Sequence, residues 1–505
     1  MANNVLLSAM QQMNNVTRTE NGGITYKSTM SGLQDLFAMG GAYRKRSDAD
    51  VIFLFDKAFK EDESYALKCL FYLRDIRGGQ GERRFFRVVT KWLATNHTEA
   101  MRRNLKFVPE YGRWDDLYVF VGTPLEKDAF DIMYHQLALD VECKTPSLLA
   151  KWLKSENTSS ADSRALAVKT RSAFRMTARQ YRKTLSVLRE RIRIVERLMS
   201  ENRWDEIEFD KLPSKAGIRY KNAFARHDLM RQKSEKNVVT YEDFAKDKNT
   251  KVNAKTLNPC EVVHEAIRAA NKSMDNTDRL MTNKYWDNLK DYFNGAVFDG
   301  VAVVDTSASM RGCYWSESKD IAPIDVAISL GMYCAEKCNP ASPWYGNYIT
   351  FSRQARLVPV QGADFVDKVR RIHDANLCEN TNIKSVFDLL LKLARQHGVK
   401  SEDMPKNIVI ISDMEFDRCS GMFSNTVLSE MEKIAAEWSV YGYQLPKLVF
   451  WNVQARQDNI PMKDNGRVTF VSGYSPVIYE MVMTGKTGLD LILDKLNTER
   501  YAAIH

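Results

Sequence analysis

The chain has 505 residues and a formal net charge of +9, with 44% hydrophobic and 27% charged residues. This balance excludes a wholly disordered chain, and the length exceeds what one ordinary hydrophobic core organises. No apolar run approaches the ~18 residues that a membrane-spanning helix needs. The eight cysteines are scattered along the chain, which is typical of reduced thiols. We therefore expect a cytoplasmic protein that does not associate with membranes.

The charge is distributed unevenly along the chain. Residues 1–295 contain 51 Lys and Arg against 39 Asp and Glu, whereas residues 296–505 contain 22 against 25. The excess is largest over residues 151–200, which hold 13 basic and 4 acidic residues. A basic part of this kind indicates a polyanionic partner. The alternative is a solvated basic face that binds no ligand.

The first part of the chain shows the three- and four-residue spacing of apolar side chains that predicts helices. Glycine- and proline-containing turns separate these segments. We therefore expect an all-α domain at residues 1–295, similar to a HEAT-like helical repeat and interrupted by an extended loop at residues 233–260. The clearest predicted helices are Ser64–Arg74, Arg83–Ala94, Ala129–Asp140 and Lys284–Phe293.

The same domain contains a run of candidate RNA-binding residues: Arg171, Arg175, Arg179, Arg182, Lys183, Arg189 and Arg193. The first four arginines are spaced by four, four and three residues, which places them on one face of a predicted helix. Unpaired arginines repel one another unless a polyanion neutralises them, and guanidinium groups bind phosphate and stack on bases. We therefore expect RNA binding here. The alternative is that these side chains pair with acids elsewhere in the fold.

From about residue 296 the pattern changes to alternating short apolar strands and amphipathic helices. This alternation predicts a doubly wound α/β domain at residues 296–505, with a mostly parallel sheet covered on both faces. Functional sites in such sheets form at the carboxyl ends of the strands. The predicted strands are Val301–Val304, Asn347–Ser352, Asn407–Ser412, Leu448–Val453 and Val468–Val471.

Oxygen-bearing side chains follow two of these strands. Asp305, Ser307 and Ser309 come directly after the first, and Asp413 terminates Asn407–Ser412. Thr381 lies between them in the sequence, in a loop that opens a helix. These are hard oxygen ligands, which suit Mg²⁺ or Mn²⁺ better than zinc. The alternative is a cluster that caps helix termini.

This set resembles the metal-ion-dependent adhesion site of von Willebrand factor A domains, whose pattern is Asp-x-Ser-x-Ser, a Thr and a second Asp. The resemblance implies that all five residues surround a divalent metal and that a carboxylate of an acidic protein partner completes the coordination. The sequence departs from the family at Glu379-Asn380, where glycines are common.

The predicted site does not indicate an enzyme. No histidine is adjacent in sequence to these loops, and a metal-dependent hydrolase would need a general base. The Gly-x-x-x-x-Gly-Lys-Ser/Thr loop is absent as well, so we expect no nucleotide cofactor.

Helical repeats followed by an A domain resemble the Ro autoantigen (TROVE-module) family. A closer local resemblance is to uncharacterised Ro-like A-domain proteins, through the segments Arg74–Arg83, Tyr111–Leu117 and Ser412–Phe416. The resemblance implies a ring of helices closed by the A domain, which binds small structured or single-stranded RNA. We therefore expect an RNA-binding ribonucleoprotein scaffold. The alternative is a metal-dependent protein-interaction module, for example a partner of a AAA+ ATPase, that binds no RNA.

Overall fold

The computed structural model describes the chain except for residues 1–4, 235–237, 271–275, 312–319, 376–379 and 427. Glu379, one of the two residues that depart from the A-domain pattern, lies outside the described residues. The chain forms two compact units. An α/β unit combines Met1–Cys69, Leu257–Met274 and Leu289–Ala502. A helical unit combines Leu70–Thr256, Asp275–Asn288 and Ala503–His505.

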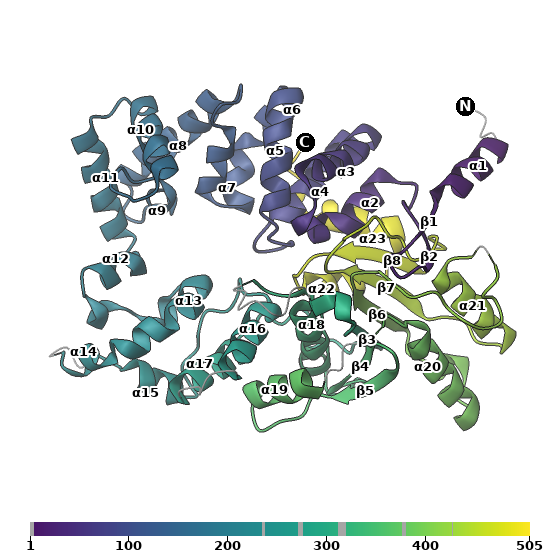
Figure 1. Cartoon of the computed structure of the whole chain (residues 1–505). Helices are drawn as coiled ribbons and strands as arrows, with labels where there is room; N and C mark the ends of the chain where they lie inside the picture. The colour runs from purple at the N-terminus through teal and green to yellow at the C-terminus, as the bar shows by residue number, and fades with distance from the viewer. Residues whose placement is uncertain (1–4, 235–237, 271–275, 312–319, 376–379, 427) are drawn as a thin grey trace. The chain divides into compact units, whose positions relative to one another are not determined.

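The predicted fold class is confirmed: a mostly helical region precedes an α/β region built on a six-stranded sheet (Figure 1). The strand order is β5-β4-β3-β6-β7-β8, and every neighbouring pair is parallel except β4 and β5. The strands are β3 (Gly300–Asp305), β4 (Asn347–Phe351), β5 (Ala355–Pro359), β6 (Asn407–Ser412), β7 (Lys447–Asn452) and β8 (Val468–Ser472). The sequence did not predict β5, which lies at the sheet edge and is mostly unburied.

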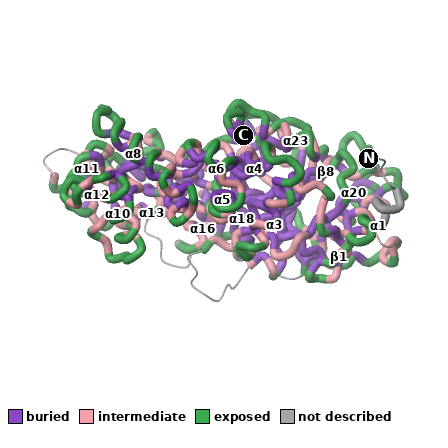
Figure 2. The backbone as a smooth tube through the Cα atoms, turned by 90° about the horizontal axis from the view of Figure 1, so that it is seen from above, coloured by how far each residue is buried: buried purple, intermediate pink, exposed green. Residues whose placement is uncertain are grey.

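Helices cover both faces of this sheet (Figure 1). They include α18 (Pro323–Lys337), α19 (Phe365–Ala375), α20 (Lys384–His397), α21 (Glu430–Val440), α22 (Val477–Val482) and α23 (Gly488–Leu496). The central helix α18 is buried from Pro323 to Ala335 (Figure 2). It lies so close to β3 that a Cβ at Gly331 would come within 2.5 Å of a Val304 methyl group. Close helix–strand packing therefore requires glycine at this position.

The first 69 residues pack with the α/β sheet rather than with the helices that follow them. They form α1 (Val5–Asn15), the hairpin β1 (Val16–Arg18) and β2 (Ile24–Tyr26), α2 (Gly32–Met39), η1 (Gly40–Lys45) and α3 (Asp48–Glu61). Helix α2 packs on β8, where Ser472 Oγ donates to the Phe37 carbonyl at 2.9 Å. The predicted boundary at residue 296 marks the change in secondary structure, but packing crosses it.

The helical unit begins within α4 (Glu63–Arg74) and continues with a series of helices. Its members include α5 (Arg84–Asn96), α6 (Thr98–Asn104), α7 (Val108–Tyr111), α8 (Glu126–Glu142), α9 (Leu149–Trp152), α10 (Ala161–Ala173), α11 (Ala178–Arg191), α12 (Val195–Ser200), α13 (Ser214–Arg226), α14 (Asp228–Gln232), α15 (Tyr241–Lys246) and α17 (Asn276–Asp287). Among the helices of the described residues, none has the length and apolarity to cross a bilayer.

Two local predictions in this part were wrong. The predicted helix Lys284–Phe293 ends at Asp287, where the Lys284 carbonyl accepts from both the amide and the side chain of Asn288, at 3.2 and 2.8 Å. The predicted loop at residues 233–260 contains α15, whose Tyr241 and Phe244 are buried against Phe209. Helix α16 (Pro259–Ala270), which follows, packs on α18 and α19 in the α/β unit.

Candidate metal centre and cationic clusters

The two predicted metal-binding aspartates lie at the carboxyl ends of adjacent strands. Asp305 ends β3, and Asp413 follows the last residue of β6. The strands pair in parallel, with Val304 opposite Ile411, so both carboxylates reach the same edge of the sheet. Both residues are almost completely buried. The topology therefore brings together two acids that are 108 positions apart in the sequence.

Hydroxyl groups surround these carboxylates. The Ser307 amide donates to Asp305 Oδ1 at 2.9 Å, and Ser412 Oγ donates to Asp305 Oδ2 at 2.5 Å. Ser307 Oγ and Ser309 Oγ are 3.1 Å apart, and the Ser309 side chain hydrogen-bonds to Asp413. Four of the five predicted ligands thus form one connected cluster of oxygen atoms.

Thr381, the fifth predicted ligand, is buried beside the loop that follows β6. Its carbonyl accepts from the Asp417 amide at 3.0 Å. Its hydroxyl accepts from Asn21 Nδ2 at 3.2 Å, and the same amide group donates to the Glu415 carbonyl. Thr381 therefore lies next to the segment that carries Asp413.

The electrostatics of this cluster fit a divalent cation. Burial and, second, the charge of Asp413 raise the pKa of Asp305, and burial raises the pKa of Asp413. Asp413 Oδ2 is buried and accepts no hydrogen bond from the described residues, although the Arg456 guanidinium lies 3.1 Å away. Two neighbouring buried carboxylates are stabilised when a cation neutralises them. Carboxylate and hydroxyl oxygens are the ligands that Mg²⁺ and Mn²⁺ favour.

Within the described residues, no group of three or more His, Cys, Asp or Glu side chains is placed to hold a metal. The candidate centre therefore depends on its serine and threonine hydroxyls. Such a mixed set of oxygen donors is unsuited to zinc, which prefers nitrogen and sulfur ligands.

Four residues near this centre were not among the sequence candidates: Glu20, Asn21, Glu415 and Arg456. Burial raises the pKa of Glu415 to about 7. Arg456 NH2 is 3.1 Å from Asp413 Oδ2, and its NH1 forms an ion pair with Glu20. The motif Ser412–Phe416 could have identified Glu415, which is two residues from Asp413. No sequence signal connects the other three residues to the site, because tertiary packing alone brings them there.

The predicted arginine face on one helix was wrong. Helix α10 ends at Ala173, and α11 begins at Ala178, with Arg175 in the left-handed conformation between them (φ 53°). A capping box made by Thr177 and Gln180 starts the second helix. The four arginines are therefore not on one continuous helix, and the four-four-three spacing does not place them on one helical face.

Four of the seven RNA-binding candidates are already engaged within the protein. Arg171 Nε and Arg182 NH1 pair with the two oxygens of Glu156 at 2.8 and 3.2 Å. Arg189 donates to the Ala150 and Leu153 carbonyls and to Ser155. The remaining pair joins Arg193 to Glu208. The alternative of pairing with acids within the fold is therefore realised at Arg171, Arg182 and Arg193, whereas Arg189 bonds to backbone carbonyls and a hydroxyl.

The other three candidates, Arg175, Arg179 and Lys183, are exposed, and no acid of the described residues lies within ion-pair distance of them. They follow one another around the α10–α11 turn and the first turns of α11. These three side chains are the part of the predicted basic surface that remains available to a polyanion.

A second cationic cluster, formed by Arg74, Arg83, Arg87 and Arg113, surrounds Asp115 and Asp116. The buried Arg74 donates to Asp116 Oδ2 from Nε at 2.9 Å and from NH2 at 2.7 Å. Arg87 binds both aspartates at 3.0 and 2.7 Å. Two segments of the family resemblance, Arg74–Arg83 and Tyr111–Leu117, thus form one structure held by buried ion pairs.

This cluster has more guanidinium groups than carboxylates. Arg113 contacts Asp115 at 3.0 Å and lies 4.1 Å above the centre of a Trp152 ring. Arg83 is exposed, and no acid of the described residues lies within ion-pair distance of it. Partial burial and the charges of Arg113, Arg87 and Arg74 lower the pKa of Arg83. A side chain in this position gains from a bound anion.

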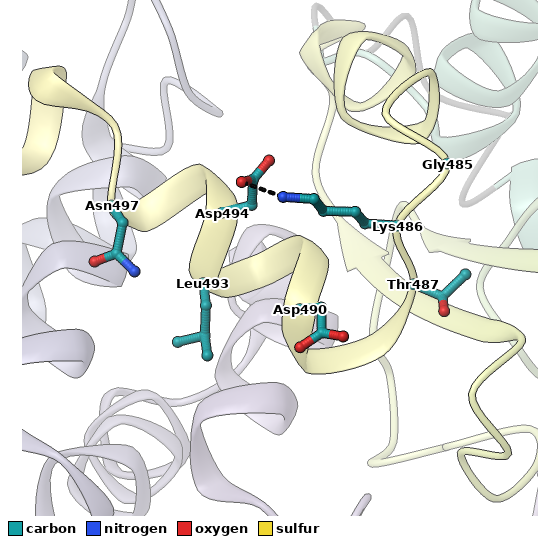
Figure 3. Close-up of a pocket in the computed structure, with 7 residues that line it drawn as sticks. All are labelled: Gly485, Lys486, Thr487, Asp490, Leu493, Asp494 and Asn497. Carbon is teal, nitrogen blue, oxygen red and sulfur yellow. Dashed lines mark hydrogen bonds and ion pairs between the residues drawn. The ribbon is translucent and has the colours of Figure 1, made fainter.

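Two surface pockets accompany these sites in the α/β unit. One, of about 440 Å³, is lined by Arg456 together with Lys27, Arg46, Asp50 and Asp458. The other, of about 500 Å³, lies along α23, where Lys486 pairs with Asp494 (Figure 3). Solvent therefore reaches Arg456 through the first pocket. In the second pocket, Asp494 already neutralises Lys486.

Comparison with known proteins shows two sequence families along the chain. Residues 19–146 and 135–292 match a domain of unknown function, DUF2828, and residues 299–500 match another, DUF7788. The chain belongs to the DUF2828 family. It is 32% identical over 513 residues to the uncharacterized protein L728 of Acanthamoeba polyphaga mimivirus. The aligned region covers 94% of this chain and 86% of the viral protein.

Among solved structures, this DUF2828 protein is similar to the Ro (RSR) protein of Deinococcus radiodurans. The similarity covers 94% of this chain and 100% of that chain, with a TM-score of 0.47 and 13% sequence identity.

Proposed function

We propose that this protein is a non-enzymatic binding scaffold whose α/β unit holds Mg²⁺ or Mn²⁺ at the edge of the sheet. The observation that carries the proposal is the cluster of Asp305, Ser307, Ser309 and Asp413, with Thr381 beside it. A bound cation would supply a positive centre that attracts a carboxylate of an acidic partner. The chain's own residues would bind and orient the cation.

The surroundings of the cluster support binding rather than catalysis. The side chains that contact the candidate ligands are hydroxyls, carboxylates, the Asn21 amide and the Arg456 guanidinium. These groups can hold a cation and recognise an anion. A hydrolytic role would require one of these groups to be placed so that it takes a proton from a substrate water.

Titration of the full-length protein with Mn²⁺ in a calorimeter tests this proposal. Asp305→Asn keeps the size of the side chain and removes the charge, so Mn²⁺ binding should fall below detection. Asp490→Asn, an exposed position on α23, is the matched control and should bind as the wild type does. Equal affinities in the wild type and in Asp305→Asn would refute the metal site.

A second function, RNA binding by the helical unit, is supported by a separate observation. Arg83 is exposed within a cluster of four guanidiniums and two carboxylates, and Arg113 of the same cluster is stacked on Trp152. Guanidiniums bind phosphate, and base stacking commonly uses arginine and aromatic surfaces together. We propose single-stranded RNA as the ligand of this surface.

Fluorescence anisotropy with a labelled single-stranded RNA at several salt concentrations tests the second function. Arg83→Gln should weaken binding and lower the slope of log affinity against log salt by roughly 0.7, the value for one phosphate contact. Arg226→Gln, which removes an exposed guanidinium on α13, should leave the slope unchanged. An unchanged slope in Arg83→Gln would exclude this side chain from the RNA contact.

A further inference from the structure

The β1–β2 turn of the N-terminal hairpin lies across the loop that follows β6. Thr19 Oγ1 donates to the Phe416 carbonyl at 2.7 Å, and Gly22 forms an antiparallel bridge with Asp417. A Cβ at Gly23 would come within 2.5 Å of the Phe416 carbonyl oxygen, so the close approach requires glycine there. The turn is therefore held against the segment that carries Asp413.

Two residues of this turn reach the candidate metal centre. The Glu20 amide donates to Glu415 Oε2 at 2.7 Å. Asn21 Nδ2 donates to the hydroxyl of Thr381 at 3.2 Å, and Thr381 is itself a predicted metal ligand. The turn thus contacts the centre through Thr381, a predicted ligand, and through Glu415, which is two residues from Asp413.

Arg456 connects the Glu20 carboxylate to Asp413. One guanidinium nitrogen pairs with Glu20 Oε2, and the other is 3.1 Å from Asp413 Oδ2. The two carboxylates share one cationic group, so they lie close to each other. Glu20 is about one-third exposed, whereas Asp413 is buried, which places Glu20 on the outer side of the centre.

We propose that Glu20 is a carboxylate of the metal centre supplied by the chain itself. This inference rests on the metal site proposed above and identifies what faces the cation there. A dication bound among Asp305, Asp413 and the hydroxyls would neutralise Asp413 in place of Arg456. The Glu20 carboxylate, which pairs with Arg456, would then lie beside the bound dication. An acidic partner therefore has to displace the Glu20 turn before it can reach the cation.

A double-mutant cycle on Mn²⁺ affinity tests the proposal in the full-length protein. Glu20→Gln should weaken Mn²⁺ binding about tenfold, because the carboxylate that faces the cation loses its charge. Arg456→Gln should strengthen binding, because the competing cation is gone. In the Arg456→Gln background, Glu20→Gln should still weaken binding by a similar factor. Glu402→Gln, an exposed acid at the opposite end of β6, is the matched control.

The cycle separates a direct role of Glu20 from an indirect one. If Glu20→Gln weakens Mn²⁺ binding only while Arg456 is present, Glu20 acts by restraining that arginine, and the proposal is wrong. It is also wrong if Glu20→Gln binds Mn²⁺ as tightly as the wild type. If the wild type binds no Mn²⁺, the metal site itself fails, which is a distinct result. Arg456→Lys, which keeps the charge, should resemble the wild type, and Arg456→Met, which also removes the charge, replaces Arg456→Gln if that variant does not fold.

A second measurement reports on the competition with an external acid. With saturating Mn²⁺, Glu20→Gln should bind a hexaglutamate peptide at least several-fold more tightly than the wild type, while Glu402→Gln should not. Equal peptide affinities in the wild type and Glu20→Gln would overturn the idea that Glu20 occupies the position of a partner carboxylate.

Discussion

At the scale of single residues, Met414 separates two buried acids, Asp413 and Glu415, with a left-handed backbone (φ 64°). Its amide donates to Ser412 Oγ at 3.0 Å, and this hydroxyl in turn donates to Asp305. The strained residue therefore belongs to the hydrogen-bonded chain that joins the two loops carrying the candidate metal ligands Asp305 and Asp413. Strain of this kind persists where surrounding contacts determine the conformation.

We expect Met414→Gly to be more stable than Met414→Ala, although glycine removes one more carbon. Both variants lose the buried side chain, but only glycine relieves the left-handed strain, which is about 1 kcal/mol or more for other residues. Urea denaturation of the two variants measures the difference. A more stable alanine variant would show that the backbone at Met414 is not strained.

Protonation of the buried acids predicts how the stability of the protein, with and without Mg²⁺ at the proposed site, depends on pH. Burial raises the pKa of Asp305, Asp413 and Glu415, the last to about 7, so the folded apoprotein holds protons that the unfolded chain releases. The stability contributed by these groups is complete below their unfolded pKa of about 4 and is lost as the pH rises through their raised folded pKa, which is about 7 for Glu415. A cation replaces these protons.

The increase in melting temperature on adding MgCl₂ should therefore be larger at pH 8 than at pH 6. Thermal melts with and without MgCl₂ at both pH values measure it, and Asp305→Asn should show a smaller increase at both. An equal increase at the two pH values would contradict metal binding that displaces protons.

At the scale of elements, the α10–α11 break separates arginines with different roles. Arg171 and Arg182 are held by Glu156, whereas Arg179 lies on the first turn of α11 with no acid partner among the described residues. The capping box Thr177-x-x-Gln180 is the sequence feature that ends the apparent long helix. The spacing of the arginines in the sequence therefore did not predict which guanidiniums share a surface, because the helix is interrupted between Ala173 and Ala178.

Two single substitutions distinguish these roles. Arg171→Gln should lower the free energy of unfolding by about 1 kcal/mol, because it leaves the half-buried Glu156 with one partner fewer, and should keep the salt slope of RNA binding. Arg179→Gln should leave stability unchanged and lower the slope by roughly 0.7. Chemical denaturation and one salt titration of each variant decide the matter. The opposite assignment of effects would show that Arg171, and not Arg179, contacts RNA.

At the scale of the whole molecule, the α/β unit depends on residues that are distant in the sequence. Leu33, Leu36 and Phe37 of α2 are buried, and α2 packs on β7 and β8. Tyr26 forms an antiparallel bridge with Ile460, and the Ala455 amide donates to the Ala42 carbonyl. The N-terminal segment is therefore part of the hydrophobic core next to β8.

A fragment containing residues 296–505 alone should consequently be unstable. Exposure of the surface that α2 covers removes burial worth about 1.5–3 kcal/mol for each large apolar side chain, against a total stability of about 5–15 kcal/mol for a domain. Circular dichroism melts should show a much lower or absent transition in the fragment than in the full-length protein. A fragment that melts like the full chain would mean that α2 contributes little.

The sequence by itself determined the two structural classes and the positions along the chain of five of the six sheet strands, because local periodicity reports directly on helices and buried strands. It also identified Asp305, Ser307, Ser309 and Asp413 as neighbours, because parallel strands bring their carboxyl ends to one edge of the sheet. Only the tertiary structure decided that residues 1–69 pack on this sheet and that Glu20, Asn21 and Arg456 join the centre. Likewise, the pairing of Arg171 and Arg182 with Glu156 depends on long-range packing, and no local pattern in a sequence records which distant side chains meet.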